Sequence, residues 1–98
     1  MKRIFFIPKD KYMKVKNGLL TDDAVSRQSI DFRDNVSLGL KDDGYYLIIE
    51  GSEQALKKAA EIMGTDAKEL KGKEMHSIEE AIMKQEDSAM SGFGNIFG

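Results

Sequence analysis

The segment from Gly44 to Met63, GYYLIIEGSEQALKKAAEIM, constrains the fold more than any other part of this sequence. Residues 45–49 are apolar on both faces of an extended chain, which is typical of a central strand. Ser52 follows as a helix N-cap, with Glu53 in the first turn. Apolar residues then recur at helical spacing up to Met63, and Gly64 stands where a glycine ends many helices. The segment therefore predicts a central strand followed by an amphipathic helix.

The residues before this segment predict further strands and one helix. RIFFI, Arg3 to Ile7, is a short apolar run typical of a buried strand, and Pro8 suits the first turn of a short helix that ends at Asn17-Gly18. Asp43-Gly44 predicts a hairpin turn. Before it, apolar residues alternate with polar or small ones, as in one or two half-buried strands, with a turn or bulge at Asp34-Asn35. The alternating residues are Ile30, Phe32, Val36, Leu38 and Leu40.

After Gly64, the sequence predicts mainly helix. TDAKELKG, from Thr65, suggests one more helical turn, and Ser77 with Glu80 forms a capping box that opens a helix ending near Met90. The expected order is strand, helix, three strands and two helices. We therefore expect an α+β fold: a three- to four-stranded, mostly antiparallel sheet with helices packed on one face. Residues 1–91 would form a single domain, and residues 92–98 a Gly/Phe-rich C-terminal tail.

The composition limits the class of protein. Ninety-eight residues, 41% hydrophobic and 33% charged, suit one well-solvated globular core. There is no cysteine, which excludes disulfides, Cys-ligated metals and thiol catalysis. No apolar run approaches a membrane span, and MKRIFFIP is too short in apolar residues for a signal peptide. We expect a cytoplasmic protein.

The residues that catalysis needs are scarce. There is one histidine, His76, and no G-x-S-x-G turn, so the usual nucleophile and base pairs cannot be assembled. Neither of the two common phosphate-binding motifs, G-x-x-x-x-G-K-[ST] and G-x-G-x-x-G, occurs before a predicted helix. We expect no enzyme activity and no cofactor. Two acidic pairs, Asp22-Asp23 and Asp42-Asp43, are typical of solvated turns; a weak calcium or magnesium site would require both turns to meet.

Binding is the remaining class of function, and the two ends of the chain offer candidates. The terminal SGFGNIFG carries three large apolar residues in a Gly-rich setting, which favours contact with a protein partner or a second copy, against packing on the parent domain or disorder. These residues are Phe93, Ile96 and Phe97. The alternative is nucleic-acid binding through an N-terminal region whose first 20 residues carry a net charge of +5. Its candidate phosphate contacts are Lys9, Lys11, Lys14 and Lys16.

Two resemblances accompany these patterns. The step YYLIIEGSEQALKKAAEIM resembles the last strand and helix of RNA-binding KH domains, but that family grips RNA with a GXXG loop, and the chain has none. The phrases LLTDDAVSRQSI, DDGYYLIIEGSEQALKKA and SGFGNIFG together resemble small uncharacterised α+β proteins of archaea. That resemblance implies a stable cytosolic domain and supplies no activity or site.

Overall fold

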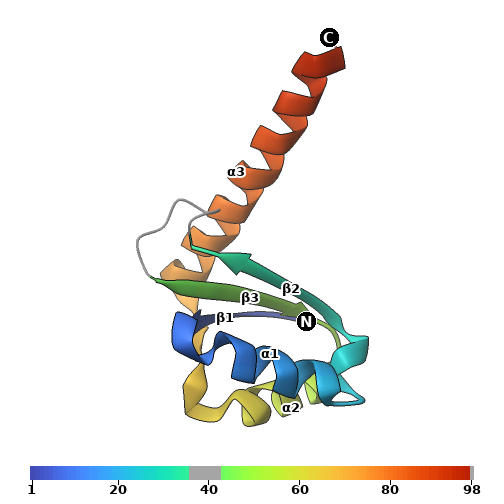
Figure 1. Ribbon diagram of the computed structural model, residues 1–98, viewed down its shortest axis with the longest axis vertical. Coiled ribbons are helices and arrows are strands. Elements are labelled where there is room, and N and C mark those ends of the chain that lie inside the picture. The colour runs from blue at the N-terminus through green and yellow to red at the C-terminus, as the bar shows by residue number, and fades with distance from the viewer. Residues whose placement is uncertain (36–42, 98) are drawn as a thin grey trace.

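The computed structural model describes residues 1–35 and 43–97, with side chains through residue 86, and forms a four-stranded sheet with helices (Figure 1). The strands are β1 (Lys2–Pro8), β2 (Ser29–Asp34), β3 (Gly44–Glu50) and β4 (Lys68–Leu70). The helices are α1 (Tyr12–Thr21), α2 (Glu53–Met63) and α3 (Gly72–Phe97). Short 3₁₀ turns are η1 (Lys9–Lys11), η2 (Val25–Arg27) and η3 (Gly64–Asp66). The expected α+β class is confirmed.

The sheet is antiparallel throughout and has the strand order β2-β3-β1-β4. Its centre is the pair of β1, which the sequence predicted as a buried strand, and β3, which the sequence predicted as apolar on both faces, with Phe5 opposite Leu47. Up to β4, the order of elements is β-α-β-β-α-β, and each helix links two strands that have another strand between them. This is the split β-α-β, or ferredoxin-like, arrangement.

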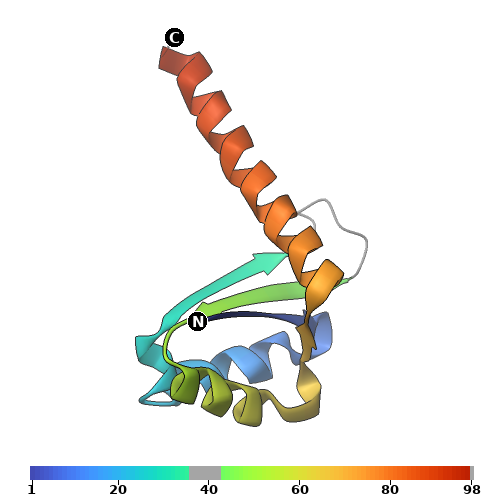
Figure 2. The same cartoon turned by 180° about the vertical axis from the view of Figure 1, so that it is seen from behind.

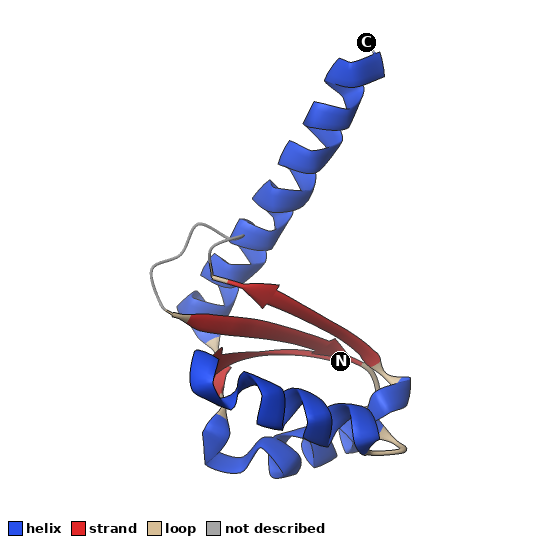
Figure 3. Ribbon diagram, in the orientation of Figure 1, coloured by secondary structure: helices blue, strands red, loops and turns tan. Residues whose placement is uncertain are grey.

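The inner face of the sheet, which we define as the face under α1 and α2, holds the larger core (Figure 3). Alternate residues of the central strands, such as Ile7 and Leu47, point into it and are fully buried. Val15 and Leu19 of α1 and Leu56 of α2 close it from the other side. Helix α2 has the predicted ends: Ser52 Oγ accepts a hydrogen bond from Ala55 N at 3.2 Å, and Gly64 takes a positive φ of 52°.

The outer face is covered as well, which corrects the expectation that the helices pack on one face. Ile4 and Tyr46 point away from α1 and α2 and are buried with Leu70 and with Ile78 of α3. Because β1 and β3 carry large apolar side chains on both faces, one helical layer leaves half of them exposed. Helix α3 buries that second set.

Three predicted boundaries also differ from the structure. Helix α1 does not end at Gly18 but continues to Thr21. A Cβ at Gly18 would lie only 3.0 Å from Ile62, so the glycine permits close contact between α1 and α2. Residues 68–70, predicted as part of a helical turn, form β4, since pairing with β1 and burial of Leu70 override local helix propensity. Ser77 lies within α3, where its hydroxyl donates to the Lys73 carbonyl, so it is not an N-cap.

The remaining predictions concern the end of α3 and the residues between β2 and β3. Helix α3 reaches Phe97 rather than ending near Met90, so residues 92–97 of the expected tail belong to it. Strand β2 confirms the first part of the alternating pattern. Its second part, from Val36 to Leu40, and most of the predicted hairpin turn lie outside the described residues. No described helix has the length and apolar character needed to cross a membrane.

Candidate functional site

Helix α3 crosses the outer face of the sheet from β4 to β2 and continues beyond β2 (Figures 1 and 2). Near its start Glu74 pairs with Lys68 of β4 at 3.7 Å, and further along Glu86 pairs with Arg33 of β2 at 3.2 Å. The twelve helical steps from Glu74 to Glu86 span about 18 Å. The three strand spacings between β4 and β2 span about 14 Å, so this stretch of helix is long enough to cross all four strands.

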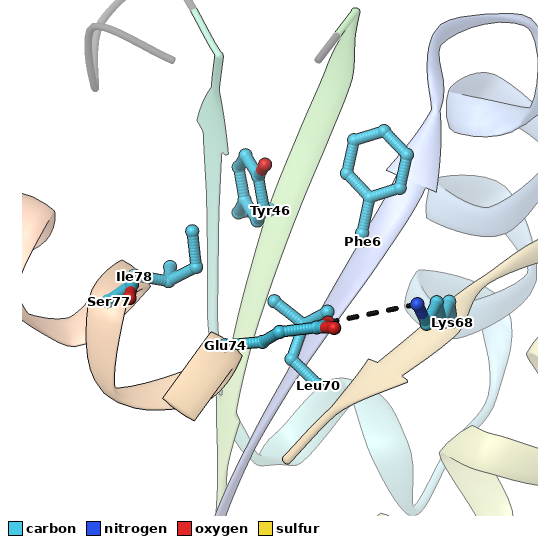
Figure 4. Close-up of a pocket in the computed structure, with 7 residues that line it drawn as sticks. All are labelled: Phe6, Tyr46, Lys68, Leu70, Glu74, Ser77 and Ile78. Carbon is cyan, nitrogen blue, oxygen red and sulfur yellow. Dashed lines mark ion pairs between the residues drawn. The ribbon is translucent and has the colours of Figure 1, made fainter. Parts of the chain in front are cut away.

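The first hollow beside α3, here called the apolar hollow, lies over β1, β3 and β4 (Figure 4). It has a volume of about 360 Å³ and is lined by Phe6, Tyr46, Lys68, Leu70, Glu74, Ser77 and Ile78. The rings of Phe6 and Tyr46 stand 5.3 Å apart between centroids and tilted by 52°. The Lys68–Glu74 ion pair stands at its rim. Such a lining suits an apolar or aromatic side chain from a partner, because its charged groups already pair with each other.

The second hollow, here called the polar hollow, lies on the β2 side of α3 and has a volume of about 300 Å³. Arg33 organises it. Its Nε donates to Asp31 Oδ2 at 2.9 Å, and its two terminal nitrogens bond Gln85 and Glu86 of α3. Arg33 therefore fixes the direction in which α3 leaves the sheet. On the other side, Lys2 and Glu79 approach to 4.0 Å, a weak and exposed pair.

The described acidic residues of the two turns, Asp22, Asp23 and Asp43, do not converge. Asp22 Oδ1 accepts hydrogen bonds from Ala24 N and Val25 N, and Asp22 Oδ2 pairs with Lys58 Nζ at 2.9 Å. The Val25 amide, followed by Lys58, holds the pKa of Asp22 below its ordinary value. This carboxylate thus shapes the turn after α1 and ties it to α2.

Asp43, the described member of the second acidic pair, lies at the far end of β3 from the Asp22 turn. Gln28 links the Asp22 turn to the end of β3, since its amide bonds both Ala24 O and Ser52 N. Asp43 precedes the start of β3. The length of this strand, about 20 Å, separates Asp43 from the end of β3 near the Asp22 turn. Asp42 lies outside the described residues. Among the described residues no group of three His, Asp or Glu side chains is placed to hold a metal ion, so the geometry offers no cation site.

The four candidate lysines lie on two short elements and do not form one face. Lys9 and Lys11 are in η1, and Lys14 and Lys16 are in α1. Residues two apart lie about 200° apart around a helix, so Lys14 and Lys16 point in different directions. Lys14 pairs with Asp66 at 3.0 Å, and Lys16 lies 5.6 Å from the Tyr12 ring centroid. This arrangement favours local pairing over a continuous track for phosphates.

The three apolar residues of the C-terminal segment all belong to the part of α3 beyond β2. In sequence, Phe93 and Ile96 continue the spacing of Met75, Ile78 and Ile82, the residues of α3 that pack on the sheet. The side chains of Phe93, Ile96 and Phe97 lie outside the described residues. Sequence reasoning identified this segment but missed both hollows, although apolar residues on both faces of β1 and β3 were a signal that a second helical layer exists.

Comparisons of the chain with protein-family models, with curated proteins and with solved structures found no match.

Proposed function

We propose that this protein is a non-enzymatic protein-binding module whose docking element is the part of α3 that extends beyond the sheet. One observation carries the proposal: α3 passes over β2, where Glu86 pairs with Arg33, and remains helical beyond the sheet through Phe97 (Figures 1 and 2). Those eleven residues extend about 16 Å past the Arg33 contact. A helix face that leaves its own sheet is available to another protein.

The sequence of this extension supports a partner. Isolated helices of this length are marginal in water, and Gly92 and Gly94 each disfavour helix by about 1 kcal/mol relative to alanine. Burial of an apolar stripe offsets such costs. Phe93 and Ile96 supply that stripe in the same helical phase that α3 uses against its own sheet.

The chemistry of the described residues supports binding over catalysis. Asp22 has a lowered pKa, but its bonds to Val25 and Lys58 explain the shift through the fold. His76 is an exposed residue of α3 whose Nε2 lies 3.1 Å from Glu80 Oε1, one turn away. The apolar hollow offers a surface for a partner side chain rather than a set of reacting groups.

The test is a charged double substitution with a matched control. Phe93→Glu with Ile96→Glu places two charges on the stripe, and Ser91→Glu with Asn95→Glu places the same two charges about 160° around the helix. The chains are compared by light scattering and by affinity capture. We expect the first pair to abolish association with the partner, whether a second copy or another protein, and the control pair to preserve it. Equal behaviour of both variants would refute a role for this stripe.

A further inference from the structure

Strand β2 presents an open sheet edge. It is the terminal strand of the order β2-β3-β1-β4. Asn35 N donates to Gly44 O at 3.0 Å, and this bond shows which residues of β2 direct their backbone N–H and C=O groups toward β3. Backbone groups of alternate residues, including Asp31 and Arg33, point to β3. Those of Ile30 and Phe32 point to the open side, where the described residues place no further strand.

We propose that a second copy of this chain pairs antiparallel with this edge, β2 against β2, about a two-fold axis at Phe32. The two sheets then form one continuous eight-stranded sheet, and the Phe32 residues exchange a pair of backbone hydrogen bonds. The proposal deepens the binding function above, on which it rests, by naming the partner. An open edge strand is a recognised template for such pairing.

The charges of β2 are self-complementary in this register. On the outer face, Asp31 and Arg33 flank Phe32. A two-fold axis at Phe32 places Asp31 opposite Arg33 of the second copy and Arg33 opposite Asp31 of the second copy. Shifting the axis to Asp31 or Arg33 would instead place like charges opposite each other, which destabilises antiparallel pairs. The order Asp-Phe-Arg therefore favours the axis at Phe32, where each Arg33, already bonded to Asp31 and Glu86 of its own chain, also faces Asp31 of the second copy.

The inner side of the same edge is aromatic. Phe32 is half-buried and meets Tyr12 edge-to-face at 5.4 Å between centroids, and Tyr12 stacks on Tyr45 at 3.7 Å. In the proposed pair, the two Phe32 side chains lie opposite each other. This joins the two aromatic clusters and removes the exposed part of each ring from water.

Helix α3 fits this arrangement. A two-fold axis perpendicular to the sheet keeps both outer faces on the same side. Because α3 leaves its own sheet across β2, its last eleven residues then extend about 16 Å toward the outer face of the second copy, which that copy's own α3 already covers. The two-fold axis makes the two α3 helices antiparallel, so each extension lies beside the α3 of the other copy.

The first test uses the absence of native cysteine. In the proposed register, residues 31 and 33 of opposite chains form a directly facing pair with Cα atoms about 4.5 Å apart, within the range of a disulfide. Residue 31 and its own symmetry mate are diagonal neighbours at roughly 7–8 Å. Mixing purified Asp31→Cys and Arg33→Cys chains under mild oxidation should therefore yield a cross-linked dimer, whereas each variant alone should yield several-fold less. Equal or absent cross-linking in the mixture would overturn the register.

The second test exchanges charges. Asp31→Arg or Arg33→Asp alone puts like charges opposite each other at two symmetric places, and should raise the dimer Kd about tenfold. The double exchange Asp31→Arg with Arg33→Asp should restore pairing, although it leaves the Arg33–Glu86 bond broken. Light scattering gives the mass against the 11.0 kDa chain, and circular dichroism confirms folding. A wild-type chain that stays monomeric at high micromolar concentration refutes the proposal.

The two proposals fail differently. If the α3 stripe variants lose a partner while the cysteine mixture forms no dimer, the binding function holds and the β2 pairing is wrong. If cross-linking at β2 succeeds and is unchanged by the stripe variants, the pairing holds and the docking role of α3 is wrong.

Discussion

Replacing Ile78 by alanine tests how α3 is attached to the sheet. Ile78 is 6% exposed and is buried with Ile4, Tyr46 and Leu70 on the outer face. The substitution removes three carbon groups, which is about 2.4 kcal/mol of transfer free energy, and leaves a cavity that raises the cost to about 3 kcal/mol. A chain of this size has a total unfolding free energy of roughly 5–15 kcal/mol, so the loss is a large fraction of it.

The matched control is Met83→Ala on the same helix. Met83 is 62% exposed, so its truncation should change the unfolding free energy by less than about 0.5 kcal/mol. Urea unfolding and thermal unfolding, both followed by circular dichroism, measure the two variants. A melting temperature lowered by about 15 °C in Ile78→Ala, against almost none in the control, is the expected result. If both variants unfold at the same urea concentration as the wild type, α3 does not pack on the outer face and the account of this surface is wrong.

Three further substitutions or measurements examine other parts of the structure. Gly44→Ala should destabilise the fold by about 2 kcal/mol in urea unfolding, because the new Cβ would lie 2.5 Å from the Ile7 carbonyl oxygen; an unchanged unfolding midpoint would contradict the close approach of β1 and β3. Asp22→Asn should lower stability at neutral pH. Because folding lowers the pKa of Asp22, the difference in stability from wild type should persist above the ordinary pKa of 3.8 and shrink as pH falls through the lower folded pKa. A difference in stability that does not depend on pH would exclude the charge of Asp22 as its cause. The wild-type protein should not shift single-stranded RNA or duplex DNA in a gel at low salt, since its candidate lysines point in different directions. A gel shift that becomes stronger as the salt concentration falls, and that is lost when all four lysines are replaced by alanine, would restore the alternative of nucleic-acid binding. These lysines are Lys9, Lys11, Lys14 and Lys16.

The central part of the fold could be predicted because its signals are local. Residues 45–49 had strand-like composition on both faces, Ser52 had a capping side chain, and Gly64 stood at the end of a helical pattern. Each of these features depends on residues that are close to it in the sequence, so the sequence pattern and the structure agree there. The first strand was equally clear from the apolar run of Arg3 to Ile7, although β1 also includes Pro8, which was predicted to begin a helix.

The elements that differ depend on contacts far along the chain. Residues 68–70 form a strand only because β1, more than sixty residues earlier, offers an edge with which to pair. Gly18 reads as a helix terminator in isolation, yet the contact with Ile62 of α2 makes it the residue that lets two helices approach. The two hollows were beyond prediction for the same reason, since they depend on the angle at which α3 crosses the sheet, and Arg33 fixes that angle through Gln85 and Glu86.

The two edges of the sheet explain why binding is expected on one side of the molecule. Strand β4 has three residues, and Gly72, with a φ of 59°, turns the chain directly from this strand into α3. Very short edge strands resist pairing with other chains. Strand β2 is twice as long, and α3 runs from the short edge toward this longer one. A helix that served only to cover the outer face could end at Glu86, where it passes β2. Its continuation to Phe97 on the open side is therefore best explained by a second surface beyond β2, which the β2-to-β2 dimer would provide.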